Sequence, residues 1–243
     1  MASKLFAYSL KGRRALFTDP VSRMGGEKMS YLFPTYQALK GITESIYWKP
    51  TFIWQIRRVR VMAQIQTESV GVRPIKFNSA SANELSYYTY LRDVHYQVEV
   101  QFDWNYNRTN LEQDRDFRKH EAMFERSLAK GGRRDIFLGT RECQGYVAPC
   151  VFGEGEGAYD NVEQLGYGIQ FHSFIYPDEN REVVEKKGVS YADLKVNLWQ
   201  PVLKNGILTF PDPEECPHQR VLYQDPIRSF TPGENFSFLE DIL

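Results

Sequence analysis

The most regular pattern of hydrophobic and polar positions runs from Val94 to Trp104. Hydrophobic residues occupy every second position of this segment, and polar residues such as Gln97 and Glu99 fill the positions between. A period of two places alternate side chains on opposite faces of a β-strand. We therefore predict a strand here, with one face in the core.

Two further strands precede it. Lys4–Leu16 is predicted as a strand that ends before Asp19-Pro20. Phe52–Ile65 also alternates, but the hydrophobic positions change phase across Arg57-Arg58. A change of phase moves the side chains to the other face, so we predict a β-bulge at this dipeptide.

Two segments have helical spacing. Thr35 can cap a helix that runs to Trp48, since Pro50 forbids its continuation. A second helix is predicted to start between Asp114 and Lys119 and to stop at the glycine pair 131–132.

With a further strand offered by Ile136–Leu138 and Gly145–Ala148, the element order up to residue 150 is βαββαβ. This order is typical of ferredoxin-like and RNA-recognition folds, whose strands lie in the order 4-1-3-2. We predict an α+β protein with a ferredoxin-like domain over residues 1–150. Residues 151–243 are predicted as an acidic extension with a smaller antiparallel sheet, in which Asn205-Gly206 is a strong hairpin signal. No periodicity is evident after Pro211.

Composition favours a folded protein inside the cell. Of 243 residues, 42% are hydrophobic, and no window reaches the roughly 20 apolar residues of a membrane span. We find no signal-peptide pattern, and three cysteines leave one unpaired under any disulfide scheme. We expect a soluble, cytoplasmic protein without a membrane partner.

The net charge of −1 conceals an uneven distribution. Residues 1–150 carry 23 Lys and Arg against 15 Asp and Glu, whereas residues 151–243 carry 7 against 16. A basic part can meet a polyanion while an acidic part contacts protein or solvent. Chance clustering of surface charge is the alternative.

The predicted topology brings three reactive residues together. In the 4-1-3-2 arrangement the end of the first helix and the start of the second lie at the same edge of the sheet. Tyr47 stands at the first position, and Lys119 and His120 stand at the second. A neutral imidazole can take the proton of a ribose 2′-hydroxyl, and an ammonium can stabilise charge on phosphorus. These residues predict RNA cleavage without a metal or cofactor. Tyr47 would orient the 2′-hydroxyl or protonate the leaving oxygen.

Each of the three also has a structural interpretation. His120 could complete an apolar stripe with Phe117 and Phe124, Lys119 could be a solvated helix residue, and Tyr47 could only pack its ring. For contacts with RNA we select six basic residues outside this trio: Lys28, Arg57, Arg58, Arg118, Arg133 and Arg134. Ion pairs within the protein are the alternative for Arg133 and Arg134.

Metal and nucleotide sites have little support. The spacing of Cys143, Cys150, Cys216 and His218 does not match zinc motifs. Acidic residues near Asp114 are more typical of charge balance at a helix start than of a Mg²⁺ site. The glycines before Lys28 lack a complete nucleotide-binding pattern.

Several motifs resemble the CRISPR-associated protein 5 family in its type I-C form. The likeness runs from about Ala15 to Phe210 and is carried by residues 15–20, 25–28, 34–41 and 45–50, by Lys119-His120, and by residues 131–139 and 141–146. The resemblance implies a ferredoxin-like domain with an added antiparallel sheet. It also implies a metal-independent endoribonuclease that cleaves precursor CRISPR RNA (pre-crRNA) near the base of the repeat hairpin. The family's catalytic Tyr, Lys and His fall on Tyr47, Lys119 and His120.

The resemblance further implies that the protein keeps the 5′ handle of the RNA. It would then join an interference complex with the large subunit and the backbone-forming protein 7 subunits. Two other functions stay open. One is a non-catalytic assembly subunit that caps the 5′ end of the RNA, and the other is binding of double-stranded DNA through Arg57, Arg58 and Arg60.

Overall fold

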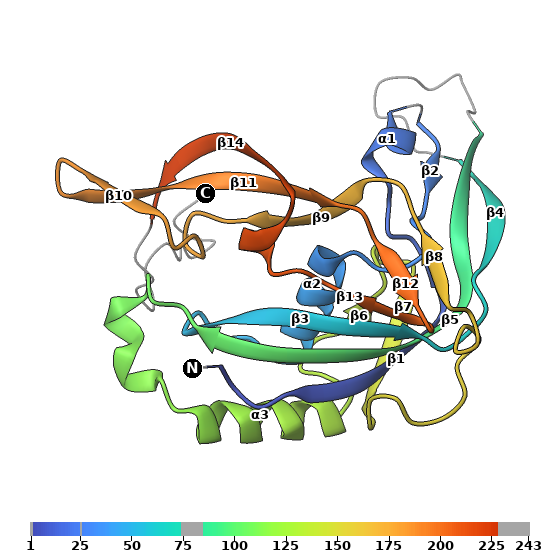
Figure 1. Cartoon of the computed structure of the whole chain (residues 1–243), viewed down its shortest axis with the longest axis horizontal. Helices are drawn as coiled ribbons and strands as arrows, with labels where there is room; N and C mark the ends of the chain where they lie inside the picture. The colour runs from blue at the N-terminus through green and yellow to red at the C-terminus, as the bar shows by residue number, and fades with distance from the viewer. Residues whose placement is uncertain (1, 25, 74–84, 228–243) are drawn as a thin grey trace, which may run out of the picture.

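A computed structural model describes residues 2–24, 26–73 and 85–227 of the protein. Within these ranges the fold is mixed α and β, with two mostly antiparallel sheets and few helices (Figure 1). The large sheet contains β1 (Phe6–Ala15), β2 (Lys28–Met29), β3 (Phe52–Val61), β4 (Gln66–Val72), β5 (Ser86–Trp104), β6 (Ile136–Phe137), β7 (Gln144–Pro149), β8 (Gln164–Gly166), β12 (Val202–Lys204) and β13 (Ile207–Thr209). The second sheet contains β9 (Gln170–Ile175), β10 (Val183–Lys186), β11 (Val189–Trp199) and β14 (His218–Pro226).

The large sheet has the order β6-β7-β1-β5-β3-β13-β12-β8, and β2 and β4 also pair with β5. Its neighbours β7, β1, β5 and β3 are antiparallel and correspond to the four strands predicted before residue 150. They lie in the predicted order 4-1-3-2. The predicted bulge is also confirmed, because the register between β3 and β5 shifts between Ile56 and Arg58.

The helices form where caps and spacing predict them. In α2 (Tyr36–Ile46) the Thr35 side chain accepts a hydrogen bond from the Ala38 amide, as an N-cap should. The other helical segments are α1 (Pro20–Arg23), α3 (Phe117–Ala129) and the 3₁₀ helices η1 (Thr109–Asp114) and η2 (Pro213–Glu215). Asp116 caps α3 by accepting from the Lys119 amide at 3.3 Å. The helix therefore begins two residues before Lys119, within the predicted range.

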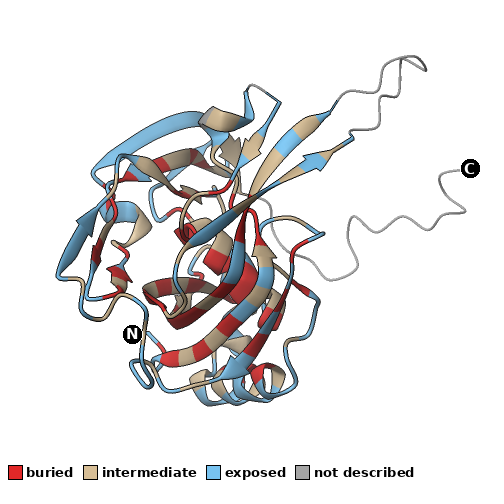
Figure 2. Ribbon diagram, turned by 90° about the vertical axis from the view of Figure 1, so that its right-hand side faces the viewer, coloured by how far each residue is buried: buried red, intermediate tan, exposed pale blue. Residues whose placement is uncertain are grey.

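Both long helices pack on the same face of the large sheet. Tyr8 of β1 hydrogen-bonds Thr43 of α2 at 2.9 Å. Phe6, two residues earlier in β1 and so on the same face, packs against Phe124 of α3 with 4.9 Å between ring centroids. Trp54 of β3 lies 4.7 Å from the same Phe124 ring. Buried residues accordingly follow the strands and the inner sides of the helices (Figure 2).

Strands from beyond residue 150 enter both sheets. The predicted hairpin is confirmed, and Asn205 and Gly206 have φ angles of 46° and 75°, as a tight hairpin turn requires. Its strand β13 pairs with β3, so this hairpin extends the large sheet, and its predicted place in the smaller sheet was wrong. The smaller antiparallel sheet is also present and includes β14, which the sequence pattern did not indicate. Most of β14 is exposed on both faces, so it shows no alternation of hydrophobic and polar residues.

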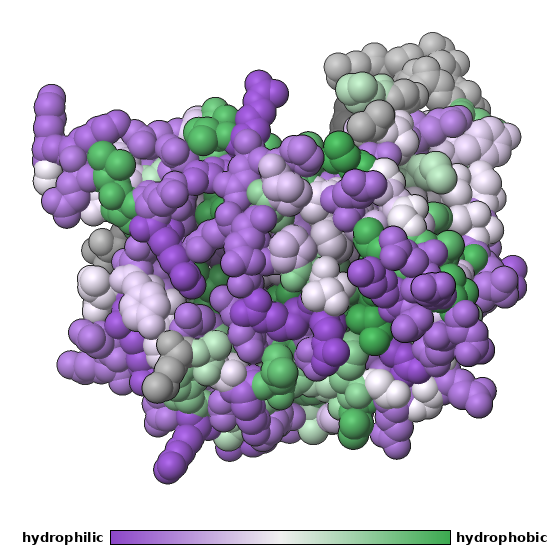
Figure 3. Space-filling model, viewed as in Figure 1, coloured by the Kyte–Doolittle hydropathy of each residue, from purple (hydrophilic) through white to green (hydrophobic). Residues whose placement is uncertain are grey.

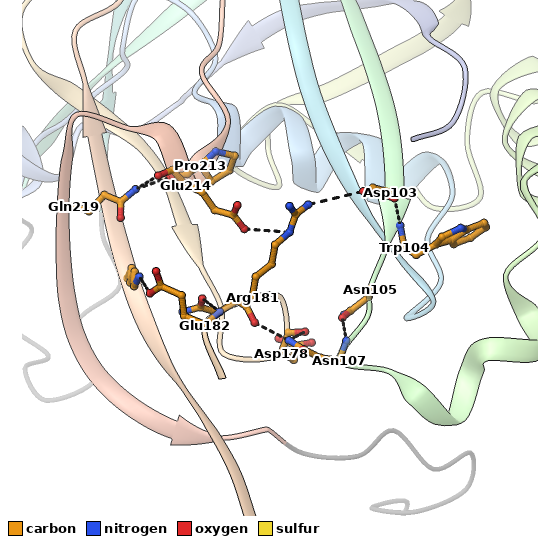
Figure 4. A network of polar contacts seen from close by, with 12 residues as sticks. Asp103, Trp104, Asn105, Asn107, Asp178, Arg181, Glu182, Pro213, Glu214 and Gln219 are labelled. Carbon is orange, nitrogen blue, oxygen red and sulfur yellow. Dashed lines mark hydrogen bonds and ion pairs between the residues drawn. The ribbon is translucent and has the colours of Figure 1, made fainter. Parts of the chain in front are cut away.

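Polar contacts hold the second sheet against the end of β5 (Figure 4). The Arg181 guanidinium lies 3.3 Å from the Glu214 carboxylate of η2 and 3.8 Å from that of Asp103 on β5. Asn107, which follows β5, donates a hydrogen bond of 2.8 Å to the Asn180 carbonyl. The segment between β9 and β10 and the helix η2 therefore meet the end of β5 at this end of the molecule.

The exposed surface is mainly polar. Hydrophilic side chains cover most of the face in Figure 3, and hydrophobic ones lie in small groups between them. Among the described helices, none has the length and apolar character needed to cross a bilayer.

Glu44 on α2 predicts a pH-dependent stability. Burial raises the pKa of its carboxyl to about 7, although the Lys40 ammonium opposes this shift. Because the folded-state pKa lies above the ordinary 4.5, the folded protein binds the extra proton, and the free energy of unfolding falls as the pH rises from 4.5 to about 7. Glu44→Gln should be more stable than the wild type by about 1–3 kcal/mol at about pH 8. Urea unfolding at about pH 8 and pH 5 would show this advantage shrinking at the lower pH. An equal gain at both values would contradict the assignment, and Glu112→Gln, at a carboxylate that is 77% exposed, is the control.

Candidate active site

Tyr47 and His120 meet in the interior, where the end of α2 faces the start of α3. The Tyr47 hydroxyl lies 2.8 Å from Nδ1 of His120, although 73 positions separate the two residues. Both side chains are 0% exposed. The predicted convergence of the phenol and the imidazole is therefore found in the structure.

The imidazole has partners at both nitrogens. Nε2 lies 2.8 Å from the backbone carbonyl oxygen of Asp114, which can only accept a hydrogen bond. Nε2 consequently carries a hydrogen, and Nδ1 of the neutral ring accepts from the Tyr47 hydroxyl. The ring also lies among aromatic side chains, 5.2 Å from Phe52 and 5.9 Å from Trp104 between centroids. His120 thus points inward with Phe124 and Leu128, because residues four apart lie on the same face of α3.

Lys119 joins this pair through Asp114. Its side chain is 49% exposed, and its ammonium forms an ion pair with the Asp114 carboxylate. The other carboxylate oxygen of Asp114 accepts from Thr51 at 2.6 Å and lies 3.4 Å from His120 Nε2. Burial alone would raise the pKa of Asp114, but the hydrogen bonds from Lys119 and Thr51 outweigh it and the pKa lies below its ordinary value. Asp114 is therefore an anion that connects the ammonium to the imidazole.

The Tyr47 phenol is a poor base in this environment. Burial raises its pKa to about 12, the Asp114 carboxylate adds to the rise, and Arg133 opposes it. The phenol stays protonated near neutral pH, so it can donate a hydrogen bond or a proton. Its oxygen also lies 3.3 Å from the Met123 sulphur.

The glycine turn after α3 is fastened to the end of α2. The amides of Arg133 and Arg134 donate to the carbonyls of Ile46 and Ser45 at 3.2 and 3.1 Å. Both arginine side chains are exposed, and the Arg133 guanidinium lies 5.4 Å from the centre of the Tyr47 ring. The turn therefore places a cation beside the buried pair.

The other basic residues selected from the sequence differ in whether carboxylates of this chain already bind them. Arg118 is exposed on α3, and the Lys28 ammonium lies 4.8 Å from the centre of the Tyr88 ring. Arg57 forms an ion pair with Asp212 at 2.6 Å, and Arg58 donates twice to Glu99 at 2.7 Å. Arg60 is buried and bound to Asp160 at 2.6 Å. The three β3 arginines are thus already engaged by carboxylates of this chain.

Sequence reasoning missed the role of Asp114 as the connecting anion. The sequence predicts charge balance at a helix start for Asp114 rather than a magnesium site, and its place just before a capped helix with a basic first turn is a usable signal for the connecting role. Among the described residues, no group of three or more His, Cys, Asp or Glu side chains is arranged to hold a metal ion.

Comparison with known proteins places the chain in a family. The family model described as CRISPR-associated protein (Cas_Cas5) matches residues 6–211. A CRISPR pre-crRNA endoribonuclease Cas5d from Thermus thermophilus is 32% identical over 148 residues, which cover 57% of this chain and 61% of the relative. A protein of the same name from Mannheimia succiniciproducens is 35% identical over 74 residues, or 30% of this chain and 28% of the relative. The chain thus aligns with less than two thirds of either relative.

Two solved structures are similar over most of their length. The crystal structure of a CRISPR-associated protein has 40% sequence identity and a TM-score of 0.74, covering 90% of this chain and 98% of that one. A functionally uncharacterized protein from Streptococcus mutans has 42% identity and a TM-score of 0.73, with the same coverage. These matches and the family model agree over nearly the whole described fold, and we conclude that this chain belongs to the CRISPR-associated Cas5 family.

Proposed function

We propose that this protein is a pre-crRNA endoribonuclease that cuts near the base of the repeat hairpin. The observation that carries the proposal is the contact of 2.8 Å between Tyr47 and His120, with Lys119 linked to it through Asp114. The name of the Thermus thermophilus relative, a pre-crRNA endoribonuclease, supports the same activity.

In the proposed reaction the RNA supplies its own nucleophile. The 2′-oxygen attacks the adjacent phosphorus while His120 takes its proton, and the bond to the 5′-oxygen breaks. The products are a 2′,3′-cyclic phosphate and a 5′-hydroxyl, whose proton comes from a protein group. Tyr47, with a pKa of about 12, orients the 2′-hydroxyl or protonates the leaving oxygen. Lys119 stabilises the negative charge on the five-coordinate phosphorus, so a metal is not required.

This mechanism requires a local rearrangement. His120 is 0% exposed and both of its nitrogens are hydrogen-bonded. The segment that covers Nε2 is the end of η1 at Asp114, held by Thr51 and Lys119. We propose that RNA phosphate takes Lys119 from Asp114, so that this segment withdraws and exposes Nε2. The ring then changes tautomer: its hydrogen moves to Nδ1, which donates it to the Tyr47 oxygen, and the exposed Nε2 is free to take the proton of the 2′-hydroxyl.

The RNA would be held through its phosphates by exposed cations. Arg118, Arg133 and Arg134 are available without breaking an ion pair with a described carboxylate, and Lys28 is half-buried beside Tyr88. Arg57 and Arg58 would first have to leave Asp212 and Glu99, which also weakens the proposal that they bind double-stranded DNA.

We also propose that β7, β1, β5 and β3, with α2 and α3, form a ferredoxin-like unit, because two helices cover one face of four antiparallel strands. The division into parts 1–150 and 151–243 stays a prediction. A cytoplasmic location, retention of the 5′ handle, and assembly with a large subunit and protein 7 subunits are likewise proposals from family membership.

A non-catalytic subunit that caps the 5′ end of the RNA is the second candidate. The buried imidazole favours it, since a histidine whose two nitrogens are both bonded inside the protein is typical of a structural role, here the joining of α2 to α3.

One cleavage assay separates the two candidates. We expect purified protein in excess EDTA to cut the repeat RNA of its own CRISPR locus between about pH 6 and 9, where imidazole chemistry operates. RNA with hydrogen in place of the 2′-hydroxyl at the scissile nucleotide should stay whole. Intact RNA in both reactions would support the capping subunit, and cutting of the 2′-deoxy RNA would exclude internal attack.

A further inference from the structure

A surface groove runs from Met123, which contacts the buried Tyr47 hydroxyl, to the edge of the large sheet. It consists of two adjoining hollows that share Lys130, Gly132 and Arg133. One hollow reaches Met123, whose sulphur touches the Tyr47 hydroxyl, and the other extends to Tyr146 on β7. We call this path the basic groove and define it by Met123, Arg126, Lys130, Arg133, Arg134 and Tyr146.

Four cations and one carboxylate line the groove. Arg126, Lys130, Arg133 and Arg134 are all exposed, and none has a carboxylate of the described residues within ion-pair distance. Asp135 is an acidic residue of the lining. Four cations without carboxylate partners form a surface that suits consecutive phosphates.

Tyr146 adds an exposed aromatic ring at the far end of this groove. Its side chain is 66% exposed. The neighbouring Gly145 and Val147 are buried, so the alternation of β7 directs Tyr146 away from the core. Lys11 lies directly across from it on β1, and it is exposed too. The ring is therefore carried on a paired strand beside further positive charge.

We propose that Tyr146 stacks on an unpaired nucleobase of the bound RNA, while the cations of the basic groove hold the adjoining phosphates. The inference rests on the proposed RNA substrate and adds the class of nucleotide that this part of the protein recognises. A ring can lie against the face of a base only where the base is not enclosed in a duplex. The basic groove would thus take single-stranded RNA next to the cleavage position.

Binding of a non-cleavable RNA tests the proposal. The probe is the repeat hairpin with its single-stranded flanks and a 2′-deoxy nucleotide at the scissile position. Tyr146→Ala should bind it roughly 5- to 150-fold more weakly, as expected for the loss of one stacked base. Tyr146→Phe keeps the ring and should bind like the wild type. Tyr223→Ala is the matched control, because Tyr223 is 57% exposed on β14 of the second sheet.

Removing single bases from the probe identifies the partner of Tyr146. In the wild type, one abasic position in a single-stranded flank should weaken binding by the same factor as Tyr146→Ala. The variant should lose nothing more at that position. Wild-type affinity of Tyr146→Ala, or an equal loss at every abasic position, would overturn the inference. Because the probe cannot be cut, this result is independent of whether the wild type cleaves ordinary RNA.

Discussion

His120→Ala is expected to reduce pre-crRNA cleavage by about 10²- to 10⁴-fold, the usual contribution of a general acid or base. RNA binding should change little, because the imidazole is buried and the exposed cations lie elsewhere. Single-turnover cleavage of the repeat RNA measures the chemical step, and binding of the 2′-deoxy probe measures affinity.

The control for this variant must separate chemistry from packing. His120 fills a buried position among Phe52, Trp104 and Tyr47, so its truncation also removes contacts between α2 and α3. Tyr47→Phe keeps the ring but removes the hydroxyl that binds Nδ1. Lys119→Ala changes a side chain that is 49% exposed and should lower cleavage without loss of melting temperature.

Each outcome has a clear meaning for the site. Lost cleavage with retained binding and folding supports the catalytic roles of His120 and Lys119. Cleavage that persists in His120→Ala, or that falls only in step with RNA binding and melting temperature, would show that the imidazole is a packing residue.

Gly139→Ala should severely destabilise the protein, by more than about 3 kcal/mol. Gly139 has a φ of 95°, which residues with a β-carbon rarely adopt. A β-carbon there would lie 2.0 Å from the carbonyl oxygen of Leu16 and 3.2 Å from the amide nitrogen of Phe17. Backbone atoms cannot move aside as a flexible side chain can, and the Leu16 amide is itself bonded to the Leu138 carbonyl.

Gly41→Ala is the matched control for this prediction. Gly41 lies in α2 with open space around its β-carbon position. Alanine there should stabilise the helix by about 0.5–1 kcal/mol, since glycine is entropically unfavourable inside a helix. Urea unfolding should therefore show a lower free energy of unfolding for Gly139→Ala and a higher one for Gly41→Ala than for the wild type. A Gly139→Ala protein as stable as the wild type would contradict the close approach to Leu16.

Features that depend on neighbouring residues could be predicted from the sequence. Thr35 caps α2 because its hydroxyl reaches an amide three residues away, and Asn205-Gly206 turns a hairpin because both residues tolerate positive φ. The phase change at Arg57-Arg58 marked the bulge in β3. The meeting of Tyr47 with the start of α3 followed from the order of these local elements.

The sequence by itself thus determined the main strands and helices, the family resemblance and the three residues that converge. Only the tertiary structure decided that His120 points inward, since its partners are a hydroxyl from α2 and the carbonyl of Asp114. It also decided that Gly139 must lack a β-carbon and that the exposed strand β14 completes the second sheet. The physical reason is range: caps and alternation arise between close neighbours in the chain, whereas burial, hydrogen-bond partners and backbone approach depend on segments that meet only after folding.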